Sequence, residues 1–195
     1  MHSKLTGYTG ESCCTYNMLK LSKHIFSFNP IARVIDYYER ALYNHILGQQ
    51  DPQTGMVCYF LPMQSGAYKV YSTPEDSFWC CVGSGFESHS KYAESIYAYN
   101  DKSLYVNLFI PSIVEWEEKG MRVTQNTEFP MDGVSTFMID VESPIEVAIK
   151  LRVPAWAGKA YAKVNGNKTG KFTPDGYFTI NRKWKKGDHI EYYVT

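Results

Sequence analysis

The stretch FWCCVGSG, residues 78–85, places two adjacent cysteines between two aromatic residues and a glycine-rich turn. A second cysteine pair, Cys13 and Cys14, follows Glu11 near the start of the chain. Neighbouring cysteines seldom bond to each other, because a disulfide between them strains the intervening peptide. Their sulfurs can instead face one soft metal ion, and zinc accepts thiolate and carboxylate ligands in a tetrahedron. The pattern predicts a zinc site whose ligands are Glu11, Cys13, Cys80 and Cys81.

Other interpretations of these cysteines stay open. The separation of the two pairs differs from the spacing of common zinc ribbons, so the spacing by itself is weak evidence. Free cysteine is among the most buried residue types, and core packing is therefore an alternative. We expect Cys14 to pack on the apolar face of a helix and Cys58 in a β-like core. A bound zinc could be a closed structural site, or it could hold one thiolate deprotonated and nucleophilic.

Composition excludes several classes of protein. The 195 residues are 44% hydrophobic and 15% aromatic, as expected for one or two folded domains. The 20 basic and 20 acidic residues balance, which argues against a nucleic-acid or anionic membrane surface. No apolar run approaches the ~20 residues that span a bilayer. The 16 tyrosines and four tryptophans suit sugar binding, but aromatic residues also build ordinary cores.

Cellular location follows only weakly from the sequence. Residues 1–4 are too short and too polar for a signal peptide. Five cysteines are an odd number, which does not fit a disulfide framework and favours a reducing compartment. We expect a bacterial cytoplasmic or periplasmic protein.

The first hundred residues carry helical periodicity. Apolar steps of three and four predict helices over residues 11–28 and 31–49, separated by Asn29-Pro30, which together form an antiparallel hairpin. A third helix is predicted over residues 84–97, and its N-terminus would favour thiolate just before it. The faces expected to be buried are Cys14, Met18, Leu21 and Ile25 in the first helix and Ile35, Tyr38, Leu42 and Ile46 in the second. A small β-hairpin is expected from residues 56–61 and 67–71.

From about residue 100 the pattern alternates with a period of two. The predicted strands are residues 104–109, 121–127, 135–141, 146–153, 161–164, 177–180 and 189–194. Asn165-Gly166 is a strong hairpin signal. Strands and turns at this spacing predict an antiparallel β-sandwich. The expected fold class is α+β, with a helical domain over residues 1–100 and a sandwich domain over residues 101–195 that is itself truncated.

Other polar residues have plain interpretations by default. Glu39 lies beside the apolar face of the second helix, where an exposed surface carboxylate is expected. His24, His45 and His89 each fall in a helical pattern, where packing or surface positions are more common than metal ligation.

Four motifs carry a family resemblance: GESCCTYNMLKL at residues 10–21, YYERALYNH at 37–45, STPEDSFWCCVG at 72–83 and LYVNLFIP at 104–111. They resemble signatures of the β-L-arabinofuranosidases of glycoside hydrolase family 127 and its close relative, family 146. The resemblance implies the end of an (α/α)6 barrel, formed by residues 1–100, followed by the start of the β-sandwich region. It also implies a retaining exo-enzyme that releases L-arabinofuranose from β-linked chains.

The resemblance assigns roles to particular residues. It implies that Glu11, Cys13, Cys80 and Cys81 bind Zn²⁺, and that Cys80 is the nucleophile in place of the usual second carboxylate. Glu39 resembles the carboxylate that binds sugar hydroxyls. The implied partner is an arabinose-containing oligosaccharide or glycan, with no nucleic acid and no membrane, and a homo-oligomer is left open. One departure is Cys14, where relatives often carry asparagine.

A carboxylic acid must also protonate the departing oxygen. In the family this acid lies upstream of the segment that matches Glu11, and the ten residues before Glu11 contain no Asp or Glu. We therefore expect a fragment that lacks its general acid and has little or no hydrolase activity by itself. The alternative function is a non-catalytic module that binds carbohydrate or protein and carries a structural zinc.

Overall fold

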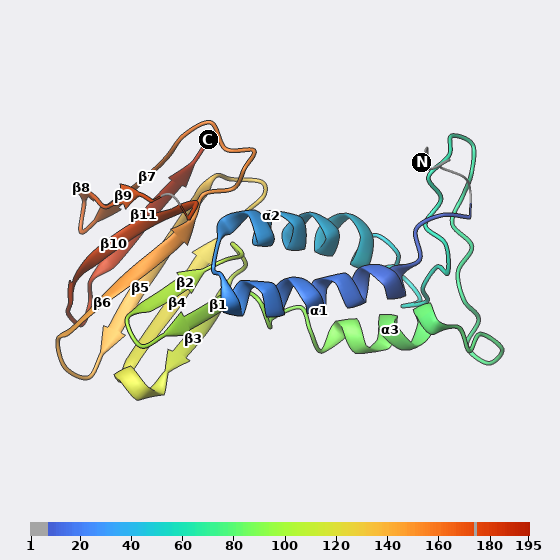
Figure 1. The fold of residues 1–195 in the computed structure, drawn as a ribbon, viewed down its shortest axis with the longest axis horizontal. Helices are drawn as coiled ribbons and strands as arrows, with labels where there is room; N and C mark the ends of the chain where they lie inside the picture. The colour runs from blue at the N-terminus through green and yellow to red at the C-terminus, as the bar shows by residue number, and fades with distance from the viewer. Residues whose placement is uncertain (1–7, 174) are drawn as a thin grey trace. The chain divides into compact units, whose positions relative to one another are not determined.

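The computed structural model describes residues 8–173 and 175–195, and these form two compact units (Figure 1). The helical unit comprises the described residues up to Asn29 together with Tyr37–Ala93, and the sandwich unit comprises Pro30–Asp36 with Glu94–Thr195. The expected class, α+β with a helical segment followed by a β-sandwich, is confirmed. The boundary between residues 100 and 101 stays a prediction. Residues 1–4, considered above as a leader, lie outside the described residues.

The helices begin and end close to the predicted positions, with one exception. They are α1 (Ser12–Phe28), α2 (Ala32–Ala41), the π-helical turn η1 (Leu42–Ile46) and α3 (Cys80–His89). The buried face predicted for the second helix is confirmed over α2 and η1. The start of α1 lies against η1 through a hydrogen bond between Thr15 and His45, as expected for antiparallel neighbours. None of the helices in the described part of the chain is both long and apolar enough to cross a membrane.

The prediction for the buried face of α1 is wrong. Met18, Leu21 and Ile25 are each about half exposed, and Cys14 is exposed rather than packed in a core. The helix instead buries Ser12, Tyr16, Leu19, Ser22 and Phe26. Apolar side chains recur at helical spacing on both sides of α1, so periodicity reveals two candidate faces without deciding which one a neighbour covers. The Tyr16 hydroxyl donates to the Glu87 carboxylate of α3, which helps to fix the face that is buried.

The third helix starts earlier and ends earlier than predicted. It begins at Cys80, with Trp79 as an extended N-cap residue, and it ends at His89. The two glycines inside it are tolerated, and a Cβ at Gly85 would lie only 3.0 Å from Cγ1 of Val57. This close approach explains why a glycine stands within a helix. Tyr97 belongs to a strand instead.

The hairpin predicted from residues 56–61 and 67–71 is present only as one antiparallel bridge, between Cys58 and Tyr71, and neither run forms a regular strand. Two further bridges pair the first run with other segments, Val57 with Gln50 and Phe60 with Glu11. The prediction that Cys58 is a buried core residue is confirmed.

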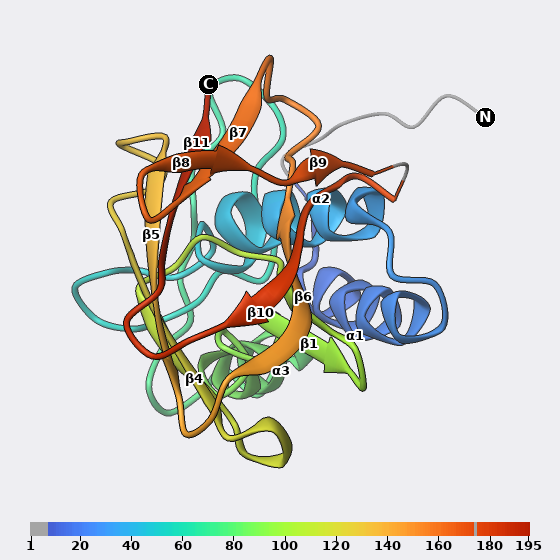
Figure 2. The same ribbon diagram turned by 90° about the vertical axis from the view of Figure 1, so that its left-hand side faces the viewer.

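Two sheets form the sandwich unit (Figures 1 and 2). The five-stranded sheet has, in spatial order, β1 (Tyr97–Asn100), β2 (Ser103–Val106), β6 (Ile145–Arg152), β10 (Tyr177–Trp184) and β9 (Lys171–Phe172). The six-stranded sheet has β3 (Ser112–Trp116), β4 (Met121–Thr127), β5 (Val134–Val141), β11 (His189–Val194), β7 (Ala160–Val164) and β8 (Asn167–Thr169). A 3₁₀ turn, η2 (Glu117–Lys119), connects β3 to β4.

Neighbouring strands are antiparallel except for the pair β2 and β6. Asn165-Gly166 forms the turn between β7 and β8, with φ values of 50° and 81°, as the sequence predicted. Side chains from both sheets close one apolar core, with Phe137 and Ile190 from one sheet and Ile149 and Trp184 from the other. The indole N–H of Trp184 donates to the Val147 carbonyl, so this buried aromatic has no unpaired polar atom.

Candidate functional site

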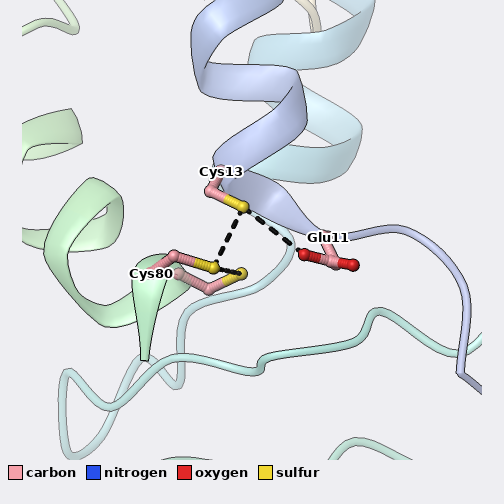
Figure 3. Close-up of side chains that lie close together, drawn as sticks. Glu11, Cys13 and Cys80 are labelled. Atoms are coloured by element: carbon pink, nitrogen blue, oxygen red, sulfur yellow. Dashed lines mark hydrogen bonds between the residues drawn. The ribbon is translucent and has the colours of Figure 1, made fainter. Parts of the chain in front are cut away.

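Two helix N-termini in the helical unit bring four side chains together. Glu11 is the N-cap residue of α1 and Cys13 lies in its first turn, while Cys80 and Cys81 are the first two residues of α3. The Cys13 thiol donates to Glu11 Oε2 over 3.6 Å, and its sulfur lies 3.2 Å from that of Cys80 (Figure 3). The sulfurs of Cys80 and Cys81 are 3.9 Å apart. One donor atom from each of the four residues lies within 4.8 Å of all the others.

These distances fit one tetrahedral metal ion. Two thiolates that each lie about 2.3 Å from a zinc ion are about 3.8 Å apart along a tetrahedral edge. The observed separations fall on both sides of that value, and the donor set of three sulfurs and one carboxylate oxygen is one that zinc accepts. The arrangement therefore has the geometry and the donor chemistry of a candidate soft-metal site.

The local backbone explains how Glu11 joins the cluster. Its φ of −71° and ψ of 124° are extended, and its carboxylate makes no capping hydrogen bond to α1. A bridge to Phe60 holds this extended residue in place. Because the chain becomes helical only after Glu11, its side chain and that of Cys13 face the same point, as the sequence predicted.

The three cysteines of the cluster differ in their exposure to solvent. Cys81 is fully buried and its thiol donates to the Tyr59 carbonyl over 3.5 Å. Cys13 is half-buried, whereas Cys80 is exposed. A molecule that approaches from solvent would therefore meet the sulfur of Cys80 first.

The thiols of Cys13 and Cys80 also differ in pKa. Burial raises the pKa of Cys13 well above its usual range, and the neighbouring sulfurs of Cys80 and Cys81 raise it further. The hydrogen bond between Cys13 and Cys80 lowers the pKa of Cys80, and a contact with the Tyr59 hydroxyl acts in the same direction. The hydrogen bond and negative charge of Cys80 raise the pKa of Tyr59 to about 12. Of the two thiols Cys13 and Cys80, Cys80 therefore ionises more readily.

A group of aromatic rings that includes Tyr59 lies beside the cluster. The Tyr59 ring meets Phe60 and Trp79 edge to face, with centroids 4.4 Å and 5.6 Å away, and Tyr8 meets Phe60 in the same manner at 5.9 Å. The Tyr59 hydroxyl lies 3.9 Å from the Cys80 sulfur. Tyr59 thus connects the exposed sulfur to a group of aromatic rings, and such rings suit contact with the carbon face of a sugar.

The remaining predicted residues lie apart from this group. Glu39 is buried on α2 rather than exposed as its default interpretation held, and it is not a member of the four-residue cluster. Its role in binding substrate stays a prediction, as do the roles of the cluster residues. Cys14 points away into solvent although it directly follows Cys13.

Sequence reasoning missed two residues beside the cluster. Tyr59 was not singled out, because a tyrosine in an aromatic run has no distinguishing spacing. His45 was expected in a packing or surface position rather than as a metal ligand, and the structure adds that its Nδ1 lies 2.7 Å from Thr15 Oγ1 and its Nε2 lies 2.9 Å from the Gly10 carbonyl. Burial lowers the pKa of His45, and the bond to the Gly10 carbonyl opposes this only in part. The position of His45 within the 37–45 motif was the one available signal.

Comparisons with known proteins agree with the motifs. A family model described as the GH127 catalytic domain of β-L-arabinofuranosidase matches residues 2–94, and the model of the GH127 middle domain matches residues 103–195. No match was found among curated proteins.

Three solved structures share the fold. One, titled "Glycoside hydrolase", is 21% identical with a TM-score of 0.82 over 95% of this chain and 32% of its own. A GH127 β-L-arabinofuranosidase from Geobacillus stearothermophilus is 22% identical with a TM-score of 0.77 over 100% of this chain and 36% of its own. A GH127 β-arabinofuranosidase is 24% identical with a TM-score of 0.79 over 95% of this chain and 32% of its own. The chain therefore spans about a third of the length of these structures.

Proposed function

Because the chain belongs to the GH127 β-L-arabinofuranosidase family of glycoside hydrolases, we propose that it carries the nucleophile half of a retaining arabinofuranosidase site. In this proposal Glu11, Cys13, Cys80 and Cys81 hold one zinc ion, and Cys80 attacks an L-arabinofuranoside. The observation that carries the proposal is the convergence of these four side chains, with Cys80 as the exposed sulfur. The glycan substrate follows from the family, and the choice of L-arabinofuranose is part of the proposal.

Each of the four cluster residues has a distinct role in the proposed zinc site. A bound zinc ion would supply positive charge that keeps its thiolate ligands deprotonated at neutral pH. Cys13 and the buried Cys81 hold the ion from the protein side, and Glu11 supplies the one oxygen ligand. Cys80 adds the fourth contact and keeps its sulfur at the surface, where a sugar can reach it.

The chemistry proceeds in two displacements. The Cys80 sulfur forms a bond to the anomeric carbon while the bond from that carbon to the leaving oxygen breaks, and a carboxylic acid gives that oxygen its proton. Water then attacks the same carbon, the carbon–sulfur bond breaks, and the thiolate is restored as the carboxylate takes a proton from the water. Two inversions at one carbon retain its configuration.

Glu39 binds the sugar in this proposal. Its carboxylate is buried on α2, where a hydrogen bond to a sugar hydroxyl would be shielded from water. Such bonds to charged acceptors are about twice as strong as neutral ones. Glu39 would thus orient the ring rather than take part in bond making.

Metal binding is the first test, and the adjacent cysteines of α1 offer a matched pair. We expect the wild-type chain, prepared without chelator, to hold one equivalent of zinc. Cys13→Ser should lose most of that zinc, while Cys14→Ser should keep it, because Cys14 is exposed and outside the cluster. Zinc that binds equally well to both variants, or to neither the wild type nor Cys14→Ser, contradicts the proposed ligand set.

Covalent labelling is the second test. p-Nitrophenyl β-L-arabinofuranoside has a leaving group acidic enough to depart with little help from a general acid. Mass spectrometry of the zinc-loaded chain incubated with it should find an arabinosyl adduct on Cys80, absent in Cys80→Ala and absent with the α-linked isomer. Zinc binding without any adduct would favour the alternative of a structural zinc in a non-catalytic module.

A further inference from the structure

His45 contacts both ends of the segment that carries Glu11 and Cys13. Its Nε2 lies 2.9 Å from the carbonyl oxygen of Gly10, the residue before Glu11. Its Nδ1 lies 2.7 Å from the hydroxyl of Thr15, two residues after Cys13. The imidazole thus joins the entry to α1 with the first turn of that helix, on either side of the two ligands.

The hydrogen-bond chemistry fixes the form of the ring. A carbonyl oxygen only accepts, so Nε2 carries the proton that is donated to Gly10. In the neutral ring Nδ1 then accepts from the Thr15 hydroxyl. Both ring nitrogens are used, and the orientation of the imidazole is set by two partners on the ligand-bearing segment.

Gly10 is held from a second side as well. Its carbonyl also accepts from the Leu61 N–H over 3.1 Å, and its φ of +86° lies in the left-handed region. A Cβ at this position would lie 3.2 Å from the Leu61 carbonyl oxygen and 3.8 Å from Cε1 of His45. The backbone just before Glu11 is therefore enclosed between His45 and Leu61, and its direction depends on both.

The π-helical turn sets the direction of His45. The Leu47 N–H donates to the Leu42 carbonyl over 2.9 Å, which is the i to i+5 bond of a π-helix. This wider turn rotates the side chains inside it relative to a continued α-helix. Single π turns occur often at functional sites, and here the turn contains the histidine that reaches α1.

We propose that His45 is a positioning residue for the metal site, holding Glu11 and Cys13 in the orientation that brings them to Cys80 and Cys81. The proposal rests on the zinc site of the proposed function. His45 touches neither the metal ligands nor the reacting atoms, and it acts through Gly10 and Thr15. Hydrogen bonds made directly to metal ligands are worth about 10–100-fold in metal affinity. His45 acts one step farther away, so we expect an effect at the lower end of that range.

The zinc affinity of the full 195-residue chain is measured by competition with a chromophoric chelator. His45→Ala should weaken zinc binding by about 10-fold, the lower end of the range for direct partners of metal ligands. His45→Gln keeps an amide N–H that can reach the Gly10 carbonyl, so we expect it to restore part of the loss. His24→Ala is the matched control, since His24 is an exposed histidine on α1, and it should bind zinc as the wild type does.

Replacing zinc with cobalt distinguishes an effect of His45 on the geometry of the site from an effect on the folding of the chain. The thiolate-to-cobalt absorption bands report the geometry of the site, and they should change in His45→Ala although circular dichroism stays that of a folded chain. If His45→Ala does not fold, Thr15→Val decides the matter, because it removes only the hydroxyl and should also weaken zinc binding.

Wild-type affinity and an unchanged cobalt spectrum in the folded histidine variant, or in Thr15→Val where that variant does not fold, overturn the positioning role alone. A wild-type chain that binds no zinc overturns the proposed function instead, and the positioning role with it.

Discussion

The two units differ in how their apolar side chains are covered. The sandwich unit closes an apolar core between its own sheets, with Trp184, Phe137 and Ile190 fully or almost fully buried. The helical unit exposes a row of apolar side chains along α1, including Leu21 at 47% and Phe28 at 88%. Burial of apolar surface is the main favourable term in folding. We conclude that the sandwich unit is stabilised mainly by its core, whereas in the helical unit the exposed apolar face of α1 adds little to stability through burial.

The largest expected effect is in the sandwich core. Trp184→Ala should lower the free energy of unfolding by about 3–5 kcal/mol, because it leaves a cavity in the core and removes the hydrogen bond from the indole N–H to the Val147 carbonyl. Trp156→Ala is the control, since that side chain is 58% exposed and stacks on Phe129 at the surface. Urea unfolding followed by circular dichroism measures both. Equal losses for the two tryptophans would contradict the core as the main source of stability.

A buried ion pair gives the next effect. Arg152 is fully buried, and its Nη1 lies 2.6 Å from Asp36 Oδ1 within the sandwich unit. Asp36→Ala leaves that cation without its carboxylate, and we expect a loss of about 3 kcal/mol. The exposed pair of Lys186 and Asp140 is the comparison, and Asp140→Ala should cost less than about 1 kcal/mol in the same urea titration.

Zinc should stabilise one unit and leave the other unchanged. At a free zinc concentration about 100 times the dissociation constant, binding stabilises the folded site by about 2.7 kcal/mol. Hydrogen exchange should therefore slow in the first turns of α1 and α3, while exchange in β5, β6, β10 and β11 stays the same. Equal slowing in both units would mean that their stabilities are linked, and that zinc does not act on the helical unit alone.

Acid should weaken the sandwich unit through Asp188. Burial raises the pKa of Asp188, but hydrogen bonds from Asn165 and the Lys185 N–H and the charge of Arg182 outweigh it, so the pKa lies below its usual value. The ionised form is thus favoured in the folded state. Its contribution is fully present above the unfolded pKa of about 4 and is lost as the pH falls through the lower folded pKa.

Asn165→Ala should raise the pKa of Asp188 and flatten this part of the acid profile. Nuclear magnetic resonance titration of the carboxyl, together with unfolding measured from neutral pH into acid, checks both statements. An Asp188 pKa that does not move in the variant contradicts the assigned hydrogen bond.

The smallest expected effect tests the two faces of α1. Leu21→Gln should change stability by less than about 0.5 kcal/mol, because this side chain is exposed. Leu19→Ala, on the buried face, should cost about 2–5 kcal/mol. Thermal unfolding of the two variants is sufficient, and a larger loss for Leu21→Gln would restore the face that the sequence predicted.

The sequence by itself determined the features that depend on neighbouring residues. Alternation in β4 and β11 gave the strands with their correct bounds, and Asn165-Gly166 gave the turn, because these patterns reflect local backbone preferences. The cysteine pairs with Glu11 predicted a four-residue cluster, because few residue types combine as soft-metal ligands. The family resemblance supplied the remaining roles.

The tertiary structure decided what depends on distant neighbours. Only the fold selects which apolar face of α1 is covered, pairs β2 with β6 in parallel, and begins α3 at Cys80 rather than at Ser84. It also leaves Cys80 exposed while Cys81 is buried, and directs His45 towards Gly10 and Thr15. Periodicity records which faces a helix has, but the side that is buried is set by contacts between segments far apart in the chain.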